Sequence, residues 1–210
     1  MKRERIGVFG GSFDPVHRVH LGLAHGALDA LQLDRVLWIP AGQPWQKSRP
    51  MTGAVHRLAM LRLALQGEPR FEIDRREIDR AGPSYTVDTV AALRAEHPDA
   101  GLYLLIGADQ YAAFHTWHRW REIARQVQLA VASRAGAPGT ADPEVQALCS
   151  VCPVPLAPSD LAATAVRERV AQGQGIADLV PDEVARYIDL HGLYRAVPSR
   201  LDGHDPDSRS

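Results

Sequence analysis

Short apolar runs alternate with longer stretches of helical period along most of the chain. Apolar runs that stop at glycine or polar residues are typical of buried parallel strands. We expect strands at residues 5–10, 35–41, 70–78, 101–109 and 127–134. Apolar positions recur every three or four residues in the predicted helices, which are 17–33, 54–66, 84–97, 161–173 and 180–194. This alternation predicts an α/β fold with a parallel sheet between two layers of helices.

Two parts of the chain give no such pattern. Residues 135–158 are rich in Pro, Gly and Ala, and no element is predicted there. The polar tail, residues 195–210, has the composition of a disordered segment, so we expect a single domain at 1–194. Hydroxyl residues at the start of 84–97, and Ser159 and Asp160 before the later helix, are candidate helix caps.

Bulk composition excludes several classes of function. The 210 residues are 45% hydrophobic and 23% charged, which suits one substantial core. The net charge of −1 provides no general attraction to nucleic acid or an acidic membrane. The sequence shows neither a secretory signal nor an apolar run that could span a bilayer, and two cysteines are too few for a disulfide framework. We therefore expect a cytoplasmic protein.

The stretch GGSFDPVHRVH, residues 10–20, has the features of a phosphate site. Glycines let backbone N–H groups approach a ligand, and the helix that follows directs N–H groups and a positive dipole end toward an anion. Ser12 adds a hydroxyl donor, and His17 and His20 share one face of the first helical turn. The alternative is a tight turn followed by surface histidines. Neither a Walker A loop nor G-x-G-x-x-G is present.

This stretch resembles the first signature of the nucleotidyltransferase superfamily, G-[GS]-[TS]-F-D-P-x-H-x-G-H, with Val19 in the place of glycine. The resemblance implies a Rossmann-like nucleotidyltransferase fold. It also implies that the histidines contact the ATP phosphates and stabilise the transition state. Residues implied to surround the nucleotide at this element are Gly10, Gly11, Ser12 and Phe13.

A second stretch, LAATAVR at residues 161–167, resembles the superfamily signature I-S-S-T-x-x-R. Thr164 and Arg167 match it, while Ala162 and Ala163 replace the two serines. The resemblance implies that Thr164 contributes to nucleotide binding and that Arg167 neutralises the β- and γ-phosphates. A solvated helix arginine is the alternative for Arg167.

Four further stretches resemble bacterial nicotinate-nucleotide adenylyltransferases, and the likeness covers residues 5–194. They are IPAGQPWQK, PSYTVDTVAALR, LIGADQYAAFHTWHRW and LVPDEVARYIDLHGLY. Residues implied to serve the phosphates and the nucleotide are Lys47, Gly107, Asp109 and Arg134. Those implied to border the nicotinate are Tyr85, Thr86 and Trp117, whose indole offers a flat surface for a pyridine ring. Ordinary core packing is the alternative for Trp117 and Trp120.

The resemblance implies transfer of AMP from ATP to nicotinate mononucleotide, with Mg²⁺ carried by ATP and no dedicated metal site. Two alternatives remain open. One is a sibling enzyme that acts on another phosphate acceptor, and the other is a nucleotide-binding regulatory protein that has lost catalysis. Cys149 and Cys152 form a single C-x-x-C, which we interpret as two partly buried thiols. A four-histidine metal site from His17, His20, His115 and His118 is a weaker hypothesis, because no carboxylate accompanies either pair.

Overall fold

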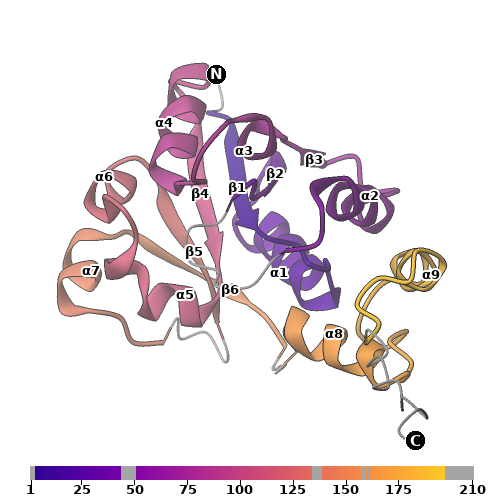
Figure 1. Ribbon diagram of the computed structural model, residues 1–210. Coiled ribbons are helices and arrows are strands. Elements are labelled where there is room, and N and C mark those ends of the chain that lie inside the picture. The colour runs from indigo at the N-terminus through magenta and orange to yellow at the C-terminus, as the bar shows by residue number, and fades with distance from the viewer. Residues whose placement is uncertain (1–2, 44–50, 134–138, 158, 160, 197–210) are drawn as a thin grey trace, which may run out of the picture.

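The computed structural model describes residues 3–43, 51–133, 139–157, 159 and 161–196. A six-stranded sheet runs through its centre in the order β3-β2-β1-β4-β5-β6, and neighbouring strands are parallel (Figure 1). The strands are β1 (Arg5–Gly11), β2 (Arg35–Pro40), β3 (Phe71–Ile73), β4 (Gly101–Ile106), β5 (Gln128–Ser133) and β6 (Val151–Pro155). Chain order reverses between β1 and β4, and ligands of such sheets bind beyond the carboxyl ends of the strands at this point.

Helices cover both faces of the sheet, as the sequence predicts. Each strand alternates its side chains between the two cores; on β1, Phe9 faces one core and Val8 the other. Helices on the face of Phe9 are α1 (Arg18–Ala30), α2 (Ala54–Ala64), α8 (Ala163–Ala171) and α9 (Asp182–Leu190). Those on the face of Val8 are α4 (Thr86–Glu96), α5 (Ala108–Ala112), α6 (Trp120–Ala124) and α7 (Pro143–Leu148), with the 3₁₀ turn η1 (Phe114–Thr116). The predicted α/β fold is confirmed.

One predicted strand is much shorter than expected. The sequence predicts a strand at 70–78, but β3 ends at Ile73 and a short helix, α3 (Arg76–Asp79), follows it. The Asp74 carboxylate accepts hydrogen bonds from the backbone N–H of Arg76 at 2.9 Å and from the Arg76 side chain at 2.6 Å. These local bonds turn the chain out of the sheet.

Residues 135–158 contain two elements that hydrophobic periodicity did not reveal. Asp142 caps α7, because its carboxylate accepts a hydrogen bond from the Glu144 N–H at 2.9 Å, and Pro143 begins the helix. The edge strand β6 contains Pro153 and Pro155. Proline lacks an N–H donor, but an edge strand has one side that needs none. Because proline is rare in strands, Pro153 and Pro155 kept this segment from being predicted as a strand.

The predicted helix caps from Ser84 and Ser159 are wrong. Helix α4 begins after Tyr85, and the Ser84 hydroxyl instead accepts hydrogen bonds from Gly42 and Gln43. Helix α8 begins after Ala162, whose methyl side chain cannot cap it. Ser159 accepts a hydrogen bond from the Leu161 N–H at 3.2 Å, outside the helix, and Asp160 lies outside the described residues.

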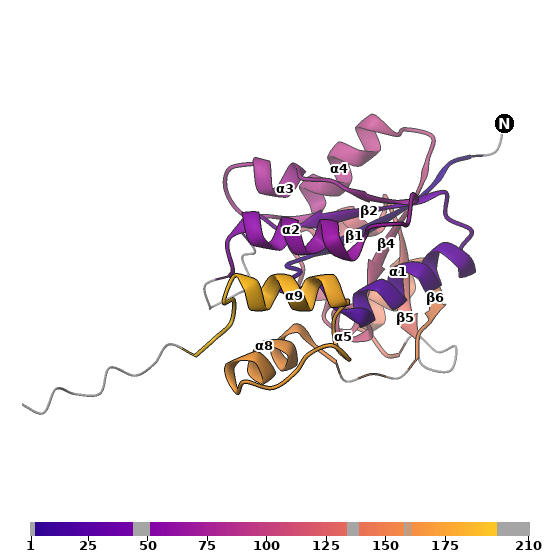
Figure 2. The same cartoon turned by 90° about the vertical axis from the view of Figure 1, so that its right-hand side faces the viewer.

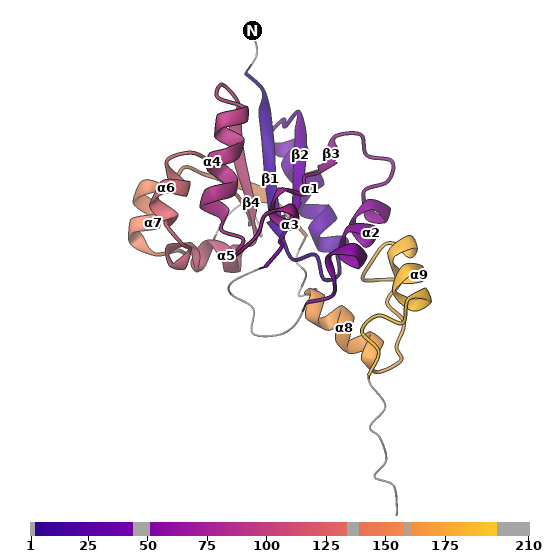
Figure 3. The same ribbon diagram turned by 45° about the horizontal axis from the view of Figure 1, so that its top comes forward.

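The last two helices lie beside α1 and α2 (Figures 2 and 3). Helix α9 contacts α2, and the Tyr187 hydroxyl lies 3.0 Å from Nδ1 of His56. The predicted boundary between a domain of 1–194 and a tail stays a prediction, because residues 197–210 lie outside the described part. No helix within the described ranges is long and apolar enough to cross a bilayer.

Candidate active site

A cavity of about 470 Å³ opens at the carboxyl ends of β1 and β4. Most of the predicted site residues line it: Gly10, Gly11, Ser12, His17, His20, Tyr85, Thr86, Gly107, Asp109 and Trp117. Val19, which replaces a glycine of the superfamily signature, also lines it. The described lining does not include Phe13, Thr164 or Arg167. Lys47 and Arg134 lie outside the described residues. The fold thus assembles one site from three segments that are remote in the sequence.

The glycine pair leaves room at the mouth of the cavity. A Cβ at Gly10 would meet no heavy atom of the described chain within 4 Å, so this position faces open space. A Cβ at Gly11 would lie 3.0 Å from the Phe13 ring. The open space beside Gly10 suits the approach of a ligand to the chain, as the sequence predicts for a phosphate site.

Phe13 anchors the chain beneath this site. Its ring is buried, with centroids 5.5 Å from Phe9 and 5.3 Å from Trp38, and its backbone has a φ of 45°. The sequence places Phe13 among the nucleotide-binding residues. The structure places its side chain in the core, so any contact with a nucleotide would come from its backbone.

The two histidines begin helix α1. His17 is the N-cap residue, and its backbone N–H donates to Nδ1 of His20 at 3.2 Å. Since Nδ1 of His20 accepts this bond, a neutral His20 carries its proton on Nε2 and can donate it to a ligand. His17 is only 4% exposed, and burial lowers its pKa from 6.5 to about 4. His17 is therefore neutral at pH 7. Of the two charge states in which it could donate to a phosphate, only the neutral one applies at this pH.

Arg167 is engaged with the protein. Its Nη1 donates to the carbonyl oxygen of Asp14 at 2.8 Å, and its Nη2 donates to the Thr164 hydroxyl at 2.8 Å. The first bond joins helix α8 to the turn that follows β1, and the second holds the guanidinium against its own helix. In the conformation described, Arg167 and Thr164 support this turn, and their contacts with phosphates stay a prediction.

Aromatic residues from α4 and the segment after η1 form another part of the lining. Tyr85 and His118 both line it, and their ring centroids lie 4.4 Å apart with planes inclined by 32°. Trp117 is half-buried in the same wall and contacts Phe114, whereas Trp120 is buried in the core. The core-packing alternative therefore holds for Trp120, whereas Trp117 packs against the core and also lines the cavity.

Sequence reasoning missed a buried polar network in this wall. The Thr89 hydroxyl donates to the Glu77 carboxylate at 2.6 Å, and the Ser84 hydroxyl bonds the same carboxylate. Burial raises the pKa of Glu77, and the two hydroxyl bonds act in the opposite direction. The network fixes the segment before Thr86 to the loop after β2, where Gly42 donates to Ser84. Glu77 belongs to no motif, and the sequence predicts a strand where the structure has α3.

A second missed residue is Arg57, which is 1% exposed within helix α2. Its guanidinium donates to three backbone carbonyls, including that of Ser12 at 2.8 Å. A signal did exist, because Arg57 lies next to Leu58 and one turn from Met60 and Leu61, which are buried apolar residues.

Comparison with known proteins agrees with this geometry. Residues 8–169 match the family described as cytidylyltransferase-like. A relative from Bordetella petrii, named a probable nicotinate-nucleotide adenylyltransferase, is 47% identical over 197 residues, which cover 91% of this chain and 100% of the relative. The chain belongs to the nicotinate-nucleotide adenylyltransferase family. A relative of the same name from Thermomicrobium roseum is 45% identical over 204 residues, covering 94% of each chain.

A solved structure shows that the likeness extends from the sequence of this nicotinate-nucleotide adenylyltransferase family member to its fold. The nicotinic acid mononucleotide adenylyltransferase of Plasmodium falciparum, in complex with NaAD, superimposes with a TM-score of 0.75. The overlap covers 91% of this chain and 98% of that chain, at 16% sequence identity. At this identity the likeness supports the shared fold.

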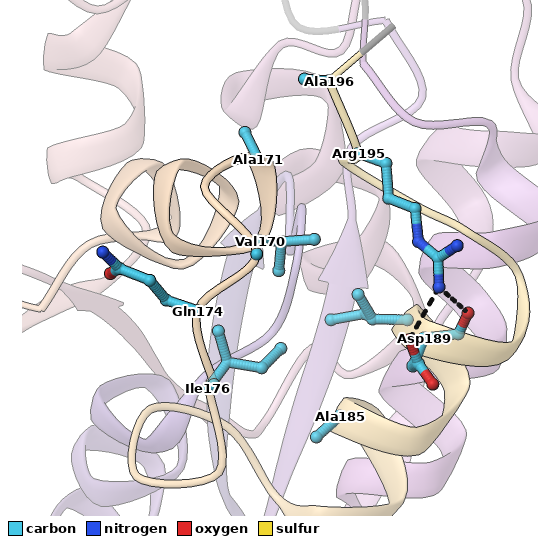
Figure 4. A pocket seen from close by; sticks show the side chains of 11 residues that line it. Val170, Ala171, Gln174, Ile176, Ala185, Asp189, Arg195 and Ala196 are labelled. Atoms are coloured by element: carbon cyan, nitrogen blue, oxygen red, sulfur yellow. Dashed lines mark hydrogen bonds and ion pairs between the residues drawn. The ribbon is translucent and has the colours of Figure 1, made fainter. Parts of the chain in front are cut away.

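The remaining features of this family member lie outside the cavity of the histidines. Cys149 and Cys152 are half-buried free thiols, as predicted, and burial raises the pKa of both. Within the described ranges, no group of three or more His, Cys, Asp or Glu side chains is arranged to hold a metal ion. A second cavity of about 530 Å³ lies between α8 and α9, next to an Arg195–Asp189 ion pair (Figure 4). Its lining contains none of the predicted site residues.

Proposed function

We propose that this protein transfers AMP from ATP to nicotinate mononucleotide, which gives nicotinate adenine dinucleotide and pyrophosphate, a step in NAD biosynthesis. The observation that carries the proposal is one cavity lined by two chemically different groups of residues, in a chain of this family. Gly10, Gly11 and the two histidines come from β1 and the start of α1, whereas Tyr85, Thr86 and Trp117 come from the start of α4 and the segment after η1. A triphosphate fits the chemistry of the first group, and a pyridine ring with its ribose fits the second.

The reaction needs little acid–base chemistry. The 5′-phosphate of nicotinate mononucleotide is an anion at pH 7, and one of its oxygens attacks the α-phosphorus of ATP. A new P–O bond forms there as the bond between the α-phosphorus and the bridging oxygen breaks, and pyrophosphate leaves with that oxygen. Catalysis then depends on in-line alignment and on stabilising charge on the phosphate oxygens. The Nε2–H of His20 is suited to the second task.

Other residues have proposed roles that rest on the family resemblance. Lys47 and Arg167 neutralise the triphosphate, Arg134 approaches a nucleotide phosphate, and Asp109 accepts hydrogen bonds from ribose hydroxyls. Magnesium enters as part of the nucleotide substrate, held by phosphate oxygens and water. The cytoplasmic location is likewise a prediction.

Pyrophosphate release tests the proposal directly. ATP and Mg²⁺ are supplied with nicotinate mononucleotide, nicotinamide mononucleotide or phosphopantetheine as acceptor. We expect release with nicotinate mononucleotide. Release with phosphopantetheine alone would keep nucleotidyl transfer and overturn the substrate. A folded protein that binds ATP and releases no pyrophosphate with any acceptor would support the regulatory alternative.

A further inference from the structure

The chain beyond α9 reaches back to the turn that follows β1. The Tyr194 hydroxyl donates to Oδ1 of Asp14 at 2.8 Å, although the two residues are 180 positions apart in the sequence. Asp14 is 0% exposed, and burial together with the Asp14 charge raises the pKa of the Tyr194 phenol. Tyr194 is thus a neutral, half-buried donor to a buried carboxylate.

The same turn, residues 12–15, is held from two other directions. From α2, Arg57 donates to the carbonyl oxygen of Ser12 at 2.8 Å, and its charge lies close to Asp14. From α8, Arg167 donates to the carbonyl oxygen of Asp14 at 2.8 Å. The backbone N–H of Thr52 lies 3.4 Å from Oδ2 of the same carboxylate. Three elements from distant parts of the chain therefore converge on a turn of four residues.

The 12–15 turn lies between residues that line the cavity, so contacts that hold the turn also affect the site. The 12–15 turn connects Gly11 to His17, and both of these residues line the cavity. A movement of the turn would shift the glycine N–H groups relative to the imidazole rings. Misplacement of catalytic groups by about 1 Å can cost on the order of 10²-fold in rate.

We propose that Tyr194 is a positioning residue for nucleotidyl transfer, which it serves by fixing Asp14 and, through it, the 12–15 turn. This inference rests on the proposed function. Tyr194 lies outside the cavity lining and acts on the reacting groups only through the turn. Loss of its hydroxyl leaves the buried Asp14 carboxylate without one of its donors, and the turn then samples other positions.

The chain offers a matched control in Tyr187. Its hydroxyl lies 3.0 Å from Nδ1 of His56, and this contact joins α9 to α2. Tyr187→Phe and Tyr194→Phe each remove one hydroxyl from the same C-terminal segment. Only the second change removes a contact with the 12–15 turn.

The test measures kcat and KM for pyrophosphate release, together with the melting temperature followed by circular dichroism. For Tyr194→Phe we expect kcat to fall about tenfold, with KM for both substrates within about twofold of the wild type. For Tyr187→Phe we expect an unchanged kcat. A merely structural role would lower the melting temperature of both variants without separating their kcat values.

Equal kcat values in the two variants, or a Tyr194→Phe variant that loses cooperative folding, would overturn the positioning role. The wild-type protein is assayed first. If it releases no pyrophosphate with any acceptor, the proposed function fails and the positioning role fails with it. If it is active and the variants are alike, only the positioning role fails.

Discussion

The imidazole rings of His17 and His20 stack at the start of α1, with centroids 3.6 Å apart and planes inclined by 28°. The bond from the His17 N–H to Nδ1 of His20 fixes the second ring against the backbone of the first. The two rings therefore present a fixed donor geometry to the cavity.

Removal of the His20 side chain should lower turnover strongly. Loss of one donor to a transition-state oxyanion typically costs about 10²–10³ in rate. We expect His20→Ala to lower kcat by this order, measured by pyrophosphate release. The control is His25→Ala, on the same helix but facing Glu68. Full activity in folded His20→Ala would exclude the assigned role.

The buried His17 should make stability depend on pH. Its pKa is about 4 in the folded protein and near 6.5 in the unfolded chain, which binds the proton more tightly. The neutral His17 ring makes its full contribution to the free energy of unfolding above pH 6.5. As the pH falls toward 4, the free energy of unfolding decreases by up to about 3 kcal/mol. Urea unfolding over this range should show a steeper loss for wild type than for His17→Gln. Identical slopes would contradict the burial argument.

Gly10→Ala should weaken ligand binding without changing the stability of the fold. The added methyl group meets no described heavy atom within 4 Å and should leave the melting temperature unchanged. It projects from the cavity lining, so we expect weaker ATP binding, measured by calorimetry. Unchanged ATP affinity in this variant would place the phosphates elsewhere.

Val19 tests the departure from the superfamily signature. Its side chain lines the cavity in the first turn of α1. We expect Val19→Gly to leave pyrophosphate release unchanged or to raise it, since the change enlarges the space for the nucleotide. The helix should lose up to about 1 kcal/mol of stability. A variant that stays folded but is inactive would mean that the valine contributes to the site.

Gly42 should tolerate no side chain. A Cβ there would overlap the carbonyl oxygen of Glu77, which is backbone and has little freedom to move. We expect Gly42→Ala to lower the free energy of unfolding by about 1–3 kcal/mol, measured with urea. Gly53→Ala is the control, because no described heavy atom lies within 4 Å of its Cβ position. Equal stability of the two variants would refute the close approach.

Periodicity and motifs predicted the fold and much of the lining of the cavity, because the elements and turns that carry them can be recognised from local sequence. A buried strand followed by Gly10 and a helix that begins near His17 can be recognised within fifteen residues or so. Contacts made across the fold leave no such signal. The bond of Thr89 to Glu77 depends on α3, where a strand was expected, and β6 was hidden by its prolines.

Arg167 was recognised from a motif, but its contact across the fold was not. Its match to the superfamily signature implies a cation in the site, and the structure engages its guanidinium with the carbonyl of Asp14. No pattern within α8 could indicate that acceptor, because Asp14 lies 153 positions earlier in the chain.

The bond between Tyr194 and Asp14 also has a consequence for biosynthesis. A ribosome makes β1 and the 12–15 turn first, and it adds Tyr194 only after 180 further residues. The turn is therefore made long before the Tyr194 hydroxyl that donates to it exists. A nascent or prematurely terminated chain has the turn without this bond, which can form only when translation has passed residue 194.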